Sequence, residues 1–405
     1  MTTPSLVTID EFGDAAEIHL TESEAAVLRA VDGLKLERGA HGRWHVSASA
    51  VVGAVRVGSA ELHIRPKIAI SRLMFLMGYS SRKDAWQDSE VRLAQADDLV
   101  AAVAGAYARL VEKALAQGIL QGYRAVEDAL PVVRGRIRVG EQVRRRPGLV
   151  LPVEVPYDEF DTDTAENRIL RAGCGALLSV PRVPSSVRRR LQHSLRLLAD
   201  ASPLVRGDVL PRWQPSRLNA RYQPALRLAE LVFRSCSVDQ GPGRVSMSGF
   251  LLNLNVIFEN FVTIALTEAL APFGGRGRMQ DRWHLDEAAA IVMKPDLVWY
   301  PSGGSGPGIV VDAKYKAEKA TGFPNADLYQ MLAYCSVLGL SEGHLVYAKG
   351  NEVATRHVLR GSGITVTQHT LDLAQPPLSL LRQVDALAAR LLSSQDESGL
   401  PLGAG

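Results

Sequence analysis

Two short apolar runs, separated by a turn rich in glycine, serine and proline, are the clearest structural signal in this sequence. The first covers residues 294–300 (KPDLVWY) and the second residues 309–316 (IVVDAKYK). Such runs, bounded by turn residues, predict the two strands of a β-hairpin. Because side chains alternate between the faces of a strand, Asp312 and Lys314 should share one face, and the hairpin partner should bring Asp296 alongside them.

These three side chains form a pattern with a chemical meaning. Asp296 and Asp312 offer hard anionic oxygens to Mg²⁺, for which Mn²⁺ can substitute, and the carbonyl of Ala313 is a third potential ligand. Lys314 can orient an attacking water molecule and stabilise negative charge on a phosphate. Each acid taken alone is equally compatible with a solvated strand terminus. Together they predict a metal-dependent phosphodiesterase centre.

Two predicted helices flank the hairpin, and each carries polar residues among apolar ones. The helix over residues 251–270 contains Glu259, which can complete the metal shell or contact Lys314. The helix over residues 326–338 carries Gln330 and Tyr334, four residues apart and therefore on one face. These two side chains can hydrogen-bond the carboxylates or a DNA phosphate. The alternative is a partly buried polar pair on a core helix.

The order helix, strand, strand, helix, strand predicts a central mixed sheet with helices packed on it for residues 241–393. Before it we expect an α+β domain over residues 1–90 and a region of helices and strands over residues 91–240. A polar tail over residues 394–405 is predicted to be disordered. A chain of 405 residues suits this multidomain organisation, of class α/β and α+β.

The region before residue 240 contains a run in which arginine alternates with small or apolar residues. Its members are Arg134, Arg136 and Arg138. If residues 132–139 form a strand, the three arginines share one face, where they can contact phosphates or an acidic partner surface. The alternative is a solvated basic edge.

Composition and absent motifs exclude other classes of protein. A net charge of +3 and 22% charged residues are ordinary for a soluble globular protein. There is no Gly-x-x-x-x-Gly-Lys-Ser/Thr loop, so we expect no nucleotide hydrolysis by this chain. Cys174, Cys236 and Cys335 are widely spaced and predict buried thiols. No signal sequence is recognisable, and the best apolar run, residues 99–111, contains Arg109, so we expect no membrane span and a cytoplasmic location.

Several segments together resemble a known class of nuclease. Pro295-Asp296, the DAK run at 312–314 and the QMLAY run at 330–334 resemble the PD-(D/E)xK core of the RecB-like variety, which carries a Gln-x-x-x-Tyr helix. More narrowly, the chain resembles the McrC family, the nuclease subunits of McrBC-type modification-dependent restriction systems. The segments that carry this narrower resemblance are LHIRPKI (62–68), LPVVRGRI (130–137), YDEF (157–160), ENRIL (166–170) and LNVIFENFV (254–262).

The resemblance implies a division of labour between two proteins. In McrBC-type systems a hexameric AAA+ GTPase, McrB, recognises modified DNA and translocates, while McrC binds this ring, stimulates its GTPase and cuts. This chain would then be a Mg²⁺-dependent endodeoxyribonuclease subunit that acts on methylcytosine-containing DNA. The part before about residue 240, including the middle region, would dock on the motor. The absence of a P-loop agrees with this scheme.

Two other functions stay open at this stage. The chain could be a non-catalytic activator or scaffold of an AAA+ motor, although a scaffold does not require Asp296, Asp312 and Lys314 together. It could also be a stand-alone RecB-like repair nuclease, although the N-terminal half is large for a nuclease accessory.

Overall fold

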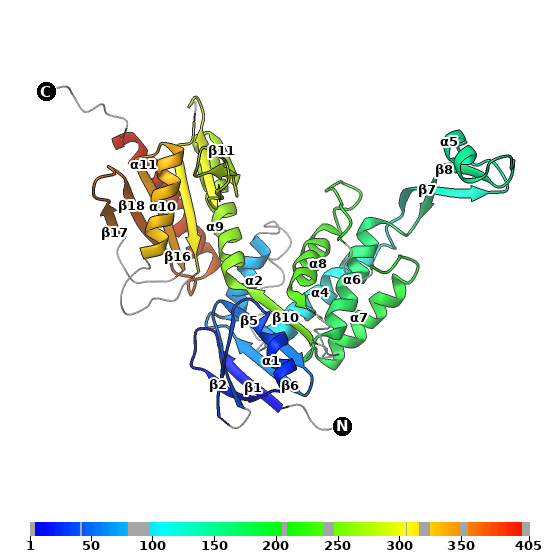
Figure 1. Cartoon of the computed structure of the whole chain (residues 1–405), viewed down its shortest axis with the longest axis horizontal. Coiled ribbons are helices and arrows are strands. Elements are labelled where there is room, and N and C mark those ends of the chain that lie inside the picture. The colour runs from blue at the N-terminus through cyan, green and yellow to red at the C-terminus, as the bar shows by residue number, and fades with distance from the viewer. Residues whose placement is uncertain are drawn as a thin grey trace. The chain divides into compact units, whose positions relative to one another are not determined.

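The computed structural model describes most of the chain and is drawn in Figure 1. The described residues are 5–40, 43–79, 98–204, 209–237, 247–304, 306–315, 325–348 and 355–398. They fall into two compact units. Unit 1 comprises Met1–Leu99, Asp239–Met247 and Leu251–Gly405, and unit 2 comprises Val100–Val238 and Ser248–Phe250. The domain boundaries predicted after residues 90 and 240 both lie outside the described residues.

The N-terminal part of unit 1 contains two small sheets. In one, β6 (Ala60–Arg65) lies between β1 (Ser5–Asp10) and β5 (Val51–Val57), and β5 continues to β10 (Met247–Asn253). The other has the order β2-β4-β3. Its strands are β2 (Ala16–His19), β3 (Leu34–Arg38) and β4 (Arg43–Ala48). Helix α1 (Glu22–Arg29) begins at a capping box formed by Thr21 and Glu24, which satisfies two backbone donors at the helix start.

The C-terminal part of unit 1 is built on a six-stranded mixed sheet with the order β11-β14-β15-β16-β18-β17. Its strands are β11 (Gly275–Met279), β14 (Leu297–Pro301), β15 (Ile309–Lys314), β16 (Glu342–Ala348), β17 (Thr355–Val358) and β18 (Thr365–Leu371). The first three run antiparallel, while β15, β16 and β18 are mutually parallel. A separate two-stranded hairpin joins β12 (Trp283–His284) and β13 (Val292–Met293). The predicted mixed sheet and the predicted β14–β15 hairpin are both present.

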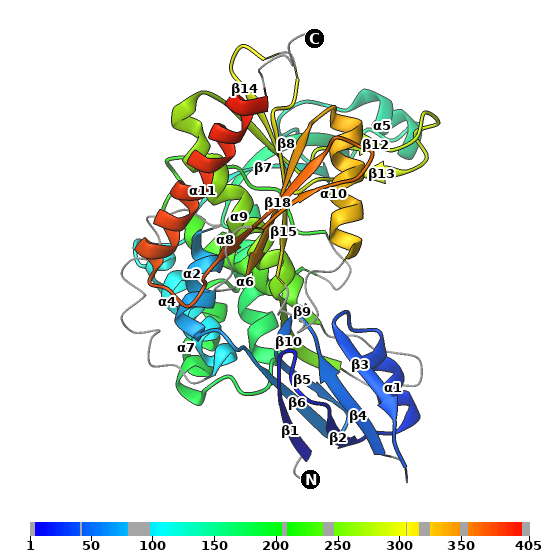
Figure 2. The same cartoon turned by 90° about the vertical axis from the view of Figure 1, so that its left-hand side faces the viewer.

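Helices cover both faces of this sheet (Figures 1 and 2). Helix α10 (Asn325–Leu338) packs through Met331 and Cys335 on Val310 and Leu345. Helices α9 (Leu254–Leu270) and α11 (Pro377–Ser398) contact each other, and they contact β15 and β18 respectively. Gly343 lets α10 approach closely, since a Cβ there would lie 2.5 Å from two sulfur atoms of that helix. Helix α11 extends to Ser398, so residues 394–398 are helical and the predicted disordered tail does not begin at residue 394.

Helix α9 differs from the sequence prediction in two respects. It begins at Leu254 rather than at residue 251, because residues 251–253 complete β10 and the Asn253 side chain accepts from the N–H of Asn255. Together with the 3₁₀ turn η3 (Ala271–Phe273), it is also long and apolar enough to cross a membrane, whereas no such run was expected. Its packing against β15, α11 and helix α2 (Ile70–Tyr79) accounts for this apolar character as that of a core helix.

Unit 2 is a group of helices that carries a β-arm (Figure 1). The helices are α4 (Leu99–Leu115), α6 (Ala165–Ser179), α7 (Ser185–Leu197) and α8 (Gln223–Ser235), and β9 (Cys236–Ser237) follows α8. The fully buried Tyr107 of α4 donates its hydroxyl to the carbonyl of Leu170 in α6 at 2.9 Å. Gly173 makes room for this ring, because a Cβ there would lie 2.3 Å from the tyrosine oxygen.

The arm consists of the antiparallel strands β7 (Gly122–Leu130) and β8 (Val153–Asp161), with helix α5 (Val139–Arg145) near its tip. The prediction of a strand over residues 132–139 is wrong. Residues 132–138 are irregular, with Gly135 at a φ of +77°. A Cβ at Gly135 would meet the carbonyl oxygen of Pro156 at 2.3 Å, so only glycine fits there.

Candidate active site

The β14–β15 hairpin brings Asp296 and Asp312 together. Leu297 pairs with Val311 in the antiparallel register, so the next residues on the two strands, Asp296 and Asp312, lie opposite each other. Val310 packs in the core beneath α10, and strand alternation therefore points both acids to the α10 face. Both side chains are buried, because Asp296 is 6% and Asp312 is 2% exposed.

Lys314 lies on the same face as Asp312, as the alternation predicted. Its Nζ lies 2.5 Å from Asp312 Oδ2. This contact is an ion pair, since Oδ2 makes no hydrogen bond of ordinary geometry in the described part of the chain. Ala313, between them, points to the opposite face, and its N–H donates to Asp296 Oδ2 at 2.8 Å. The backbone of β15 thus fixes the orientation of the acid that directly precedes β14.

Burial and mutual repulsion disfavour the charged form of both aspartates. The pKa of Asp296 is raised to about 7, first by burial and then by the negative charge of Glu259. The pKa of Asp312 is also raised to about 7, by burial and then by the charge of Asp296. Burial lowers the pKa of the Lys314 ammonium, but the Asp312 carboxylate outweighs burial and the net pKa is raised. A single ammonium does not balance this group of acids, which favours an additional cation.

Glu259 reaches the acids through a residue that the sequence did not indicate. The amide nitrogen of Gln280 donates to Glu259 Oε1 and, at 3.0 Å, to Asp296 Oδ1. Burial raises the pKa of Glu259. Gln280 follows β11 and has a φ of +52°, a conformation that few residues other than glycine adopt. Sequence spacing gives no signal for this bridge, because it joins residues 16 and 21 positions apart.

The structure places Gln330 and Tyr334 on one face of α10, as predicted. Gln330 Nε2 donates to the Tyr334 hydroxyl at 2.9 Å, and this hydroxyl lies 3.4 Å from the carbonyl oxygen of Lys294. Burial, followed by the charges of Asp312 and Asp296, raises the pKa of Tyr334. The phenol therefore stays protonated beside the acid pair, although its hydrogen bonds go to α10 and the backbone rather than to the carboxylates.

The three predicted contact arginines lie on the arm of unit 2, whereas the acids belong to unit 1. The guanidinium of Arg134 lies 5.0 Å from the ring centre of Tyr157, and Arg138 pairs with Glu127 at 2.6 Å. The backbone N–H of Arg136 donates to the Pro156 carbonyl at 3.4 Å. The predicted common strand face does not form. Two of the three arginines are instead engaged within the arm.

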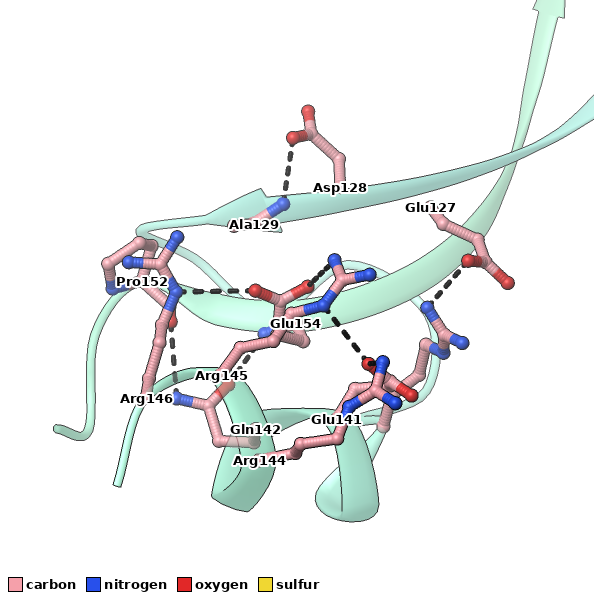
Figure 3. A network of polar contacts seen from close by, with 11 residues as sticks. Glu127, Asp128, Ala129, Glu141, Gln142, Arg144, Arg145, Arg146, Pro152 and Glu154 are labelled. Carbon is pink, nitrogen blue, oxygen red and sulfur yellow. Dashed lines mark hydrogen bonds and ion pairs between the residues drawn. The ribbon is translucent and has the colours of Figure 1, made fainter. Parts of the chain in front are cut away.

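The tip of the arm is organised around Glu154 (Figure 3). This buried carboxylate accepts from Arg146 Nε at 3.2 Å and lies 3.6 Å from Arg145 Nη1. The side chain of Gln142 accepts from the Glu154 N–H at 2.7 Å and donates to the carbonyl of Pro152 at 3.2 Å. These contacts attach α5 to β8. The tip therefore has a fixed structure even though most of its apolar side chains are exposed.

The residues present fit a divalent cation bound through few carboxylates. Two buried acids face each other, and one ammonium, that of Lys314, is the cation paired with Asp312. Because N–H and C=O of one strand residue point to the same side, the Ala313 carbonyl points toward Asp296, as its N–H does. Among the described residues no three His, Cys, Asp or Glu side chains are arranged to hold a metal. A cation here would therefore also need the Ala313 carbonyl and water.

The chain is thus a multidomain α/β protein with a buried acid–lysine cluster on a mixed sheet and a separate β-arm. A family model described as the McrBC 5-methylcytosine restriction system component matches residues 46–348. This is well over half of the chain, and the chain belongs to that family.

Solved structures with a similar fold were also found. A chain of the half-complex of Thermococcus gammatolerans McrB AAA+ hexamers with bound McrC matches with a TM-score of 0.59 and 17% identity, covering 96% of this chain and 100% of that one. A chain of the Thermococcus gammatolerans McrBC complex matches with a TM-score of 0.41 and 19% identity, covering 66% and 88%. None of the curated proteins compared matches significantly.

Proposed function

We propose that this chain is the DNA-cleaving subunit of a McrBC-type restriction complex and that its C-terminal sheet is a PD-(D/E)xK nuclease core. The observation that carries the proposal is the acid–lysine cluster: Asp296 and Asp312 opposed across a hairpin, with Lys314 2.5 Å from Asp312 on the same face. Burying like charges together lowers the stability of the fold, so their presence favours a catalytic role. The family assignment supports a restriction function.

The residues of the cluster have distinct roles in this proposal. Asp296, Asp312 and the Ala313 carbonyl hold Mg²⁺, or Mn²⁺ in its place, with Glu259 as a further candidate ligand. The bound metal would neutralise the phosphodiester and lower the pKa of a water molecule. Lys314 orients the attacking water and stabilises charge on the phosphate.

The Gln280 amide holds Glu259 and Asp296 in position, because it donates to both carboxylates. Gln330 and Tyr334 act as hydrogen-bond donors at the rim, toward a DNA phosphate.

The second part of the proposal concerns the partner. The Thermococcus chain that this fold resembles comes from a complex of McrB AAA+ hexamers. An arm with a fixed tip, exposed apolar residues and arginines suits docking on such a ring, and Arg134, Arg136 and Arg138 are candidate contacts to the ring or to DNA. Recognition of methylcytosine would belong to the partner. The complex would act in the cytoplasm.

A separation of functions tests this proposal. In a complex with the McrB-like GTPase, Asp312→Ala should reduce cleavage of methylated plasmid by on the order of a thousandfold, because one metal ligand is lost. Partner binding and GTPase stimulation should stay within about twofold of wild type. Asp372→Ala, which removes a partly buried acid elsewhere in unit 1, is the matched control. Retained cleavage, or loss of both activities in a folded protein, would contradict the proposal.

A further inference from the structure

A pocket of about 580 Å³ is lined by residues of the β12–β13 hairpin and of α10, next to the acid–lysine cluster. Its walls include Arg282, Leu285, Val292, Met293, Lys294 and Tyr334. The pocket adjoins the cluster without including the acids. Lys294 stands two residues before Asp296, and its carbonyl oxygen lies 3.4 Å from the Tyr334 hydroxyl. One short segment of chain therefore forms both a wall of the pocket and an edge of the candidate active site.

The charged side chains that line the pocket are all cationic. Arg282 and Lys294 are exposed, and neither forms an ion pair within the described ranges. The nearby Arg278 differs, since it lies 3.6 Å from Asp281. A pocket with two uncompensated cations and no carboxylate in its wall attracts an anionic ligand.

Besides the two cations, the wall of the pocket contains apolar side chains. Leu285 is 45% and Val292 is 41% exposed, although both belong to or border a short hairpin where polar residues would be the usual choice. Met293 and Ala333 extend this surface inward. Cations beside an exposed apolar wall suit a nucleotide, whose phosphate is anionic and whose base and sugar present apolar faces.

The hairpin that forms this wall is held in place before any ligand binds. Asp286 accepts from the N–H of Ile291 at 2.7 Å and of Ala290 at 3.2 Å, which closes the turn. Trp283 Nε1 donates to Asp281 at 3.2 Å, and the Trp283 ring packs on the core beneath α10. A preformed wall binds with a smaller loss of conformational entropy than a mobile loop does.

We propose that this pocket binds a nucleotide of the DNA strand next to the scissile phosphate. Arg282 and Lys294 contact the backbone phosphate, and Leu285 and Val292 contact the base or sugar. This inference rests on the proposed function, since it assigns a strand-positioning subsite to that nuclease centre.

The salt dependence of DNA binding tests the subsite. The full-length chain is titrated onto a fluorescent single-stranded oligonucleotide at several KCl concentrations, with Ca²⁺ in place of Mg²⁺, and anisotropy is measured. Arg282→Ala and Lys294→Ala should each weaken binding about threefold to tenfold and reduce the salt slope by about 1, as expected for one lost phosphate contact. Val292→Ser should weaken binding without changing the slope.

The matched control is Arg356→Ala, which removes an exposed cation from the edge strand β17. It should leave both affinity and slope near wild type. The inference is overturned if the wild-type chain does not bind the oligonucleotide or if the pocket variants bind like wild type. It is also overturned if Arg356→Ala weakens binding equally, or if poly-glutamate competes as well as DNA does.

Cleavage kinetics in the presence of the McrB-like GTPase test the subsite and the proposed nuclease function separately. Arg282→Ala should raise the KM for DNA about fivefold and keep kcat within about twofold, because it removes binding rather than chemistry. If wild type cleaves, Asp312→Ala does not, and Arg282→Ala has an unchanged KM, the subsite alone is wrong. If wild type and Asp312→Ala cleave equally, the proposed function itself is wrong.

Discussion

Among single residues, the candidate site is distinguished by two buried acids that face each other. Asp296 and Asp312 are both nearly inaccessible, and the pKa of each is raised to about 7 by burial and by neighbouring negative charge. Isolated buried acids are costly, so a fold that keeps two of them in contact needs a compensating cation. Lys314 supplies one positive charge, and the proposed metal ion supplies the remainder.

Substitution of Gln280 should lower DNA cleavage without a large change in the free energy of unfolding. Gln280→Gly should change the free energy of unfolding by less than about 1 kcal/mol, because relief of the positive φ offsets the lost hydrogen bonds and the added freedom of the unfolded chain. DNA cleavage should fall about tenfold, since Glu259 and Asp296 lose their shared donor.

Chemical denaturation and single-turnover cleavage measure the two effects. Ala289→Gly, at another residue with positive φ, is the control and should leave cleavage unchanged. Cleavage at the wild-type rate by Gln280→Gly would refute a positioning role for this side chain.

A buried histidine pair predicts how stability depends on pH. His344 and His369 are 3% and 4% exposed, and His369 Nε2 lies 3.3 Å from His344 Nδ1. Burial lowers the pKa of each to about 3, so both are neutral in the folded chain but bind protons near pH 6.5 when unfolded. Their contribution to stability is complete above pH 6.5 and is lost as the pH falls toward 3.

Between pH 6.5 and 5 this loss should amount to about 3 kcal/mol for the two histidines together. Asp296 and Asp312, whose pKa is raised to about 7, bind protons on folding over the same range and act in the opposite direction. The histidine share is therefore measured by denaturant unfolding of wild type against His369→Leu, which should change the dependence on pH by about 1.5 kcal/mol over this range. His284→Gln, which removes an exposed histidine, should not change it. Parallel curves for wild type and His369→Leu would show that the pair does not titrate in this way.

Among secondary-structure elements, local pattern predicted the hairpin and the helices but not the tip of the arm. Alternation fixed the faces of β14 and β15, because a strand's period depends only on its own residues. The same reasoning failed for residues 132–139. There, alternating arginines suggested a strand, whereas Gly135 is pressed against the Pro156 carbonyl and the side chains fold back onto β7 and β8. The Gln280 bridge could not be predicted from local pattern either, because β11 and β14 become neighbours only in the folded sheet.

Removal of the Glu154 carboxylate should loosen the tip of the arm. Glu154→Ala should release Arg145 and Arg146 and loosen α5 without unfolding the helices of unit 2, because its contacts all lie at the tip. Hydrogen exchange should show about tenfold lower protection in residues 139–145, and stimulation of the partner GTPase should fall. Arg144→Ala breaks only an exposed pair with Glu141 and serves as the control. Unchanged exchange would mean that Glu154 does not hold the tip together.

In the whole molecule, the residues proposed for DNA cleavage and those proposed for docking on the partner belong to different units. The acid–lysine cluster lies entirely in unit 1, and the arm lies entirely in unit 2. Within unit 1, the buried Glu11 accepts from the hydroxyl of Tyr315 at 3.1 Å, so the N-terminal strands contact the residue directly after Lys314. The sequence predicted a nuclease region and a docking region, but not that residues 1–99 share a unit with the nuclease sheet.

The proposed function requires that Asp296 and Asp312 together bind a divalent cation. Calorimetric titration of Mn²⁺ into the full-length chain tests it most directly. We predict a binding site that is lost in Asp296→Asn and in Asp312→Asn but kept in Asp372→Asn. If the wild-type chain binds no Mn²⁺, or if the two variants bind it as the wild type does, the acid pair is not a metal site and the proposed function is contradicted.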